Sequence, residues 1–177
     1  MKATIASVAL ALCATIQAAR ADEAAAYSAL QATGQDSMSI SAQYGADDIW
    51  RGEESSWCTT LSEANTDSWD ATDQNHYWGA LNVALTALNN ANDDLSAANS
   101  AIISGGNYFN AAWRAYNAHD WDFCVVCCSD AVLEWYGADG AGGAEASLSG
   151  AQSKLQNCDD SLSAAQLIYN RYNPPPM

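Results

Sequence analysis

The chain has 177 residues, 49% of them apolar, and its 21 acidic residues outnumber its 6 basic residues to give a formal net charge of −15. This length and apolar content suit a single domain with its own core. The charge excludes nucleic acid and anionic lipid as partners, because so few cations are present to neutralise phosphates. Cations, basic proteins or neutral glycans fit better, unless the acidity serves solubility alone.

Residues 1–21 have the layout of a secretory signal peptide. Lys2 precedes an apolar run from Ile5 to Ile16, and Ala19-Arg20-Ala21 offers a small-residue cleavage site. The run is too short to span a bilayer, and no later segment is long and apolar enough to do so. We therefore expect a secreted, extracellular protein without a membrane span, whose mature domain covers residues 22–173.

The first expected helix runs from near Asp22 to about Tyr44, and Gly34 is a point where it could split. The following segment, 45–79, differs in composition, because it is rich in acidic residues and in tryptophan. We expect this segment either to be a functional excursion from the helices or to contain a short helix of its own, around Thr59–Ala64.

The strongest pattern in the chain lies in residues 80–102. Apolar residues alternate there at spacings of three and four, as in a helix that packs along one seam. The seam residues are Leu81, Ala84, Leu88, Ala91, Leu95, Ala98 and Ile102. Residues 147–169 repeat the seam 67 positions later, as Leu148, Ala151, Leu155, Cys158, Leu162, Ala165 and Tyr169. The two stretches predict helices that pack together and suggest an internal duplication.

Glycines and clusters of polar residues predict where the remaining helices begin and end. The first seam helix should stop at Gly105-Gly106, since glycine is common just after a helix. A further helical region is expected over Tyr108–Tyr136, with a break at His119 and a new start capped by Asp120. Residues 137–143 read as a turn, and the last helix should run to about Tyr172, ahead of a proline-rich tail over 174–177. The expected fold is all-α, an antiparallel bundle of about four helices that could represent two duplicated hairpins.

Five cysteines would remain after removal of a leader that contains Cys13: Cys58, Cys124, Cys127, Cys128 and Cys158. In an oxidising compartment we expect disulfide staples, with two of the three clustered cysteines joined to Cys58 and Cys158. The odd thiol would then be free, linked to another chain or bound to another group. Two other readings are a metal site in which His119 joins the clustered thiols, and a cysteine nucleophile activated by His76 or His119.

The acidic and aromatic segment 47–78 supplies the candidate binding residues. Its indole rings, Trp50, Trp57, Trp69 and Trp78, could stack on sugars or pack onto the bundle. Its carboxylates Asp67, Asp70 and Asp73 could gather calcium, although they lack the spacing of the twelve-residue calcium loop. No other cofactor is expected.

No pair of carboxylates stands out as catalytic, and the common nucleophile, phosphate-binding and zinc-protease motifs do not occur. The sequence therefore favours a secreted, non-enzymatic structural or assembly protein, such as a matrix or fibre subunit, that acts through self-association or contacts with other extracellular proteins. The alternative is a secreted module that binds glycan or calcium through residues 47–78.

Overall fold

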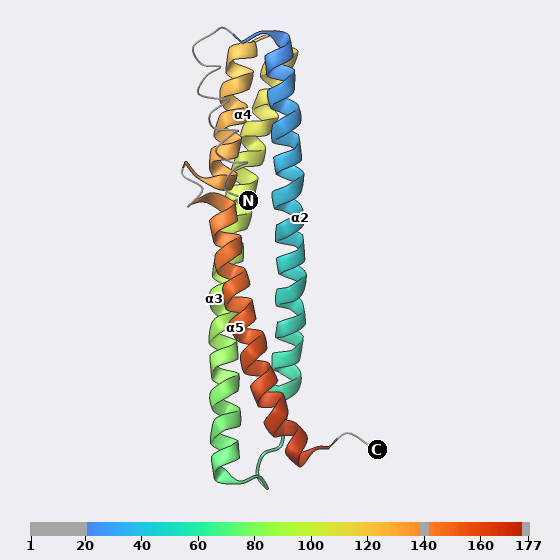
Figure 1. The fold of residues 1–177 in the computed structure, drawn as a ribbon, viewed down its shortest axis with the longest axis vertical. Helices are drawn as coiled ribbons and strands as arrows, with labels where there is room; N and C mark the ends of the chain where they lie inside the picture. Colours follow the sequence, from blue (N-terminus) through green and yellow to red (C-terminus); the bar gives the residue numbers. More distant parts are fainter. Residues whose placement is uncertain (1–20, 139–141, 175–177) are drawn as a thin grey trace. The chain divides into compact units, whose positions relative to one another are not determined.

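The computed structural model describes residues 21–138 and 142–174, which form four α-helices and no strand (Figure 1). The helices are α2 (Glu23–Ser62), α3 (Ala71–Asn117), α4 (Trp121–Tyr136) and α5 (Gly143–Tyr172). The all-α prediction is confirmed. The expected signal peptide and most of the expected tail fall on residues 1–20 and 175–177, outside the described part of the chain. None of the helices in the described ranges has the length and apolar character needed to cross a membrane.

The chain divides into two compact units, which share the long helices. Unit 1 consists of Met1–Gly45 and Ser96–Leu148, and unit 2 of Ala46–Leu95 and Ser149–Met177. The start of α2, the end of α3 and all of α4 therefore belong to unit 1. The end of α2, the start of α3 and most of α5 belong to unit 2.

Contacts within unit 2 fix the directions of its helices. Lys154 pairs with Asp94 at 2.6 Å, and Arg171 pairs with Asp73 at 3.1 Å. From Lys154 to Arg171 along α5, the partners on α3 run backwards from Asp94 to Asp73. The two helices are therefore antiparallel. The α2 segment runs parallel to α5, since Asp47 meets Gln152 and Trp57 meets Gln166.

The predicted seam is the core of unit 2. One hydrophobic cluster contains seam residues from both helices, and these side chains are at most 9% exposed: Leu81, Ala84, Leu88, Ala91, Leu155, Cys158, Leu162 and Ala165. Alternation of leucine with alanine or cysteine lets two helices approach closely while the leucines fill the space between them. The prediction that these two stretches are helices that pack together is confirmed.

Unit 1 is built on the same plan with α4 as the third helix. Its core cluster joins Ala26 and Leu30 of α2, Ala112 and Ala115 of α3, and four residues of α4, namely Cys124, Val125, Cys127 and Cys128. The α3 and α4 helices are antiparallel, because Trp135 contacts Ile102 while Trp121 contacts Tyr116.

The segment 45–79 differs from the expected excursion. The α2 helix continues without a break through Gly34 and Gly45 to Ser62, and α3 begins at Ala71, so the stretch between them is short. No proline interrupts this region, and the tryptophans have a packing surface on α5 within unit 2. The segment is polar because it forms the exposed faces of helices. The prediction of a separate excursion left out this possibility.

The expected helix end at Gly105-Gly106 is wrong, because α3 continues to Asn117. Gly105 is buried, and a Cβ placed on it would overlap the indole of Trp135. Here glycine permits close packing between two helices and does not terminate one. By contrast, the break at His119-Asp120 is confirmed: His119 has a φ of 61°, and the Asp120 carboxylate accepts a hydrogen bond from the Phe123 amide at 3.2 Å.

Candidate functional site

The four tryptophans of the 47–78 segment are packed within unit 2. The indole N–H of Trp50 donates to Glu54 at 2.9 Å, that of Trp57 to Gln166 at 3.1 Å, and that of Trp78 to Thr66 at 3.2 Å. Trp69 is 8% exposed and stacks on Tyr172, with ring centroids 4.6 Å apart and ring planes inclined by 8°. A ring face that is covered by another ring is not open to a sugar.

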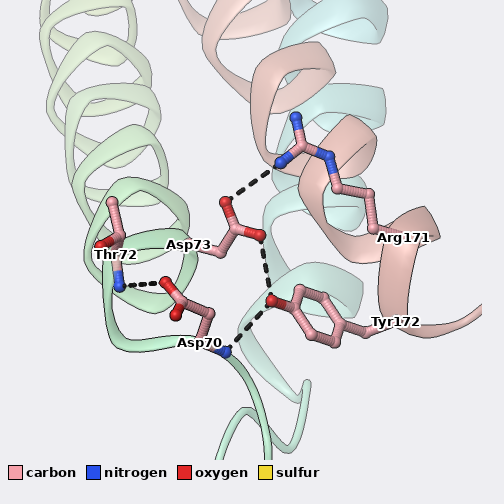
Figure 2. A network of polar contacts seen from close by, with 5 residues as sticks. All are labelled: Asp70, Thr72, Asp73, Arg171 and Tyr172. Carbon is pink, nitrogen blue, oxygen red and sulfur yellow. Dashed lines mark hydrogen bonds and ion pairs between the residues drawn. The ribbon is translucent and has the colours of Figure 1, made fainter.

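Two of the three predicted calcium ligands, Asp70 and Asp73, are engaged in contacts that organise one end of unit 2 (Figure 2). Asp73 accepts hydrogen bonds from Arg171 at 3.1 Å and from the Tyr172 hydroxyl at 3.0 Å. The Asp70 carboxylate accepts from the Thr72 amide at 2.8 Å, and backbone amides hold the pKa of Asp70 below its ordinary value. These contacts cap the start of α3 and tie it to the end of α5.

Asp67 does not join Asp70 and Asp73 in a ligand set. Its backbone amide donates to the Asn65 side chain at 3.0 Å in the turn that follows α2. Throughout residues 21–138 and 142–174, no group of three or more histidine, cysteine or acidic residues is arranged to hold a metal ion. Calcium binding through these three aspartates therefore stays a prediction from sequence, and the geometry adds no support to it.

The disulfide staples expected from sequence are not found among the described residues, where all five cysteines are free thiols. Cys124, Cys127 and Cys128 lie in the core of unit 1, whereas Cys58 and Cys158 lie in the core of unit 2. Each thiol is buried as a small apolar side chain. The spacing in the sequence could not show that the clustered cysteines belong to a different core from the other two.

Two further readings of the cysteines are not supported by their surroundings. His76 and His119 are exposed while the thiols are buried, so neither imidazole is placed among them. Burial raises the pKa of each of the five described thiols, that of Cys128 and of Cys158 to about 12. A thiol with a raised pKa stays protonated near neutral pH and is a poor nucleophile or metal ligand.

Two acidic side chains that the sequence analysis did not single out are buried in unit 2. Asp47 and Glu54 are each 4% exposed. Both oxygens of Asp47 accept hydrogen bonds from the Gln152 amide, at 3.0 and 3.2 Å. Oε1 of Glu54 accepts from Trp50, but its Oε2 has no hydrogen-bond partner. Desolvation by burial raises the pKa of both carboxyl groups.

A spacing of seven residues could have revealed these buried acids. Asp47, Glu54 and Leu61 follow one another at that interval, and all three are buried. Residues seven apart lie on the same face of a helix, so a continuous helix over 45–62 would have placed both acids in line with the core residue Leu61. The prediction of a separate excursion assumed no continuous helix over these residues, so the spacing of seven was not considered.

The most exposed apolar surface on α4 lies opposite its buried face. Phe123 is 53% exposed and Val126 is 38% exposed, while Cys124, Cys127 and Trp135 on the other side are buried. Leu133, seven residues after Val126, is half-buried on the same outward face. We call Phe123, Val126 and Leu133 the outer α4 face. Large apolar side chains that cluster on a surface are typical of contact sites.

Comparison with known proteins gives no relative for this chain: no family model, no curated protein and no solved structure matches it.

Proposed function

We propose that the protein is a secreted, non-enzymatic structural or assembly protein that works through surface contacts, and that the outer α4 face joins one copy to another. The observation that carries this proposal is the exposure of Phe123 and Val126, 53% and 38%, on a helix whose other face is already packed. Covering such side chains on association removes apolar surface from water, which contributes roughly 25 cal/mol per Å².

The acidic residues beside the outer α4 face bear on how tightly copies associate. Asp122 and Asp130 lie one helical turn before and after Val126. In a symmetric contact the same patch meets itself, so these carboxylates would approach their own copies. The apolar contact therefore has to outweigh a repulsion between like charges, which favours a modest affinity that depends on salt.

Sedimentation of the protein over a concentration series tests this proposal. We expect the mass-averaged size to rise with concentration, and a Phe123→Ser, Val126→Ser double variant to stay monomeric. Leu167→Ser is the matched control, since Leu167 is 68% exposed but lies in unit 2. We expect reductant to have no effect, because every described thiol is buried. A wild-type protein that stays monomeric at all concentrations would refute the proposal.

A further inference from the structure

Glu54 lies in the interface between α2 and α5 without a cation to balance it. The residue is 4% exposed, one carboxyl oxygen accepts from the Trp50 indole at 2.9 Å, and the other has no hydrogen-bond partner. The thiol of Cys158, on α5, is directed at the carboxyl group, and a thiol is a weak donor. A buried carboxylate in such surroundings carries a large desolvation penalty.

The charged groups that face Glu54 have the same sign as an ionised carboxylate. They are Glu53 on its own helix and Asp159 on α5, while the thiols of Cys58 and Cys158 are the other titratable neighbours. The basic residues in the described part of unit 2 are all engaged elsewhere: Arg51 with Asp48, Lys154 with Asp94 and Arg171 with Asp73. No lysine or arginine in the described part of this unit is therefore left to compensate an ionised Glu54.

We propose that the Glu54 carboxyl group is a proton-controlled contact, which packs against α5 in its protonated form and loosens the α2–α5 interface of unit 2 when it ionises. A protonated carboxyl group keeps its other oxygen as the acceptor for Trp50 and carries no charge into the core. Ionisation leaves an unpaired charge there, which is relieved when Glu54 reaches water and α2 separates from α5.

The direction of the pH effect follows from burial. Desolvation raises the pKa of folded Glu54 above its value in the unfolded chain. Below the unfolded value both states are protonated and the contact is fully stable. As pH rises above that value the unfolded state loses its proton first, so the folding equilibrium weakens by up to about tenfold per pH unit until folded Glu54 also ionises. Acid therefore stabilises this contact and neutral pH weakens it.

The test is denaturant unfolding of the full chain between pH 4 and pH 8, for wild type, Glu54→Gln and Glu53→Gln. Glutamine mimics the protonated acid. We expect Glu54→Gln to match wild type at pH 4 and to exceed it in folding equilibrium constant at pH 7, by up to about tenfold for each pH unit over which only folded Glu54 stays protonated. Glu53→Gln removes the same charge from the neighbouring exposed position. It should keep most of the pH dependence of wild type, because burial is the largest cause of the raised pKa of Glu54 and repulsion from Glu53 is a smaller one.

A spectroscopic measurement keeps the proposal falsifiable if Glu54→Gln fails to fold. The indole N–H resonance of Trp50 reports on Glu54 directly, whereas that of Trp57 reports on the neutral Gln166. We expect the Trp50 resonance of wild type to titrate with a midpoint above the ordinary glutamate pKa, and that of Trp57 to move less. A Trp50 midpoint at or below the ordinary value would overturn the proposal, as would a Glu54→Gln variant no more stable than wild type at pH 7.

Discussion

Gly105 and Gly106 are adjacent, yet they have different surroundings in unit 1. A Cβ on Gly105 would overlap the Trp135 indole, whereas a Cβ on Gly106 would meet nothing within 4 Å. Trp135 is fully buried, and its indole N–H donates to the Ile102 carbonyl oxygen at 3.3 Å. Because Gly105 has no side chain, α4 can approach α3 closely where Trp135 lies.

Alanine substitutions at the two glycines should have opposite effects. We expect Gly105→Ala to displace Trp135 and lower the free energy of unfolding by about 1–3 kcal/mol, the usual cost of overpacking. Gly106→Ala should raise it by about 0.5–1 kcal/mol, because alanine is the better helix former. Denaturant unfolding followed by tryptophan fluorescence measures both. Equal effects of the two substitutions would show that Trp135 does not occupy the space beside Gly105.

At the scale of helices, the seam between α3 and α5 should account for much of the stability of unit 2. Leu155 is fully buried within the cluster that joins the two helices. We expect Leu155→Ala to lower the free energy of unfolding by about 2–5 kcal/mol, from lost burial and from the cavity it leaves. Leu167→Ala, on the same helix but at a 68% exposed position, should change it by less than about 0.5 kcal/mol.

The measurement for the seam is urea unfolding monitored by circular dichroism, with the two leucine variants compared under identical conditions. Similar losses from Leu155→Ala and Leu167→Ala would contradict the packing of α5 against α3. This prediction concerns the packing of the two helices as a whole, because leucines from both helices fill one hydrophobic cluster.

For the whole molecule, we expect the charge distribution to affect the proposed self-association. The chain carries a net charge of −15, and the described part of unit 1 contains a single basic residue, Arg114. We expect self-association through the outer α4 face to strengthen when salt rises from about 0.01 to about 0.5 M, because the Debye length falls from about 30 Å to a few ångströms. Sedimentation at both salt concentrations measures this. Weaker association at high salt would instead indicate contacts between opposite charges.

The helical seam was predictable because a spacing of three and four residues is a local property of a helix. The seam positions within residues 81–95 and 151–165 could be assigned to buried faces from this spacing, and the break before Asp120 followed from its capping chemistry. The candidate sites were less predictable. Indole rings and carboxylates in the 47–78 segment suggested a ligand, yet in unit 2 their polar atoms bind one another and neighbouring helices.

The sequence by itself determined that the chain is helical, acidic and built around leucine and alanine stripes, since these features depend on residues close together along the chain. The tertiary structure alone decided which cysteines share a core, why a glycine pair lies inside a helix, and that Glu54 is buried without a counter-ion. Each of these depends on side chains that are distant in sequence: Trp135 fills the space beside Gly105, and Cys158 and Asp159 face Glu54 across the α2–α5 interface. Burial and charge balance therefore depend on contacts between residues that are far apart in the sequence.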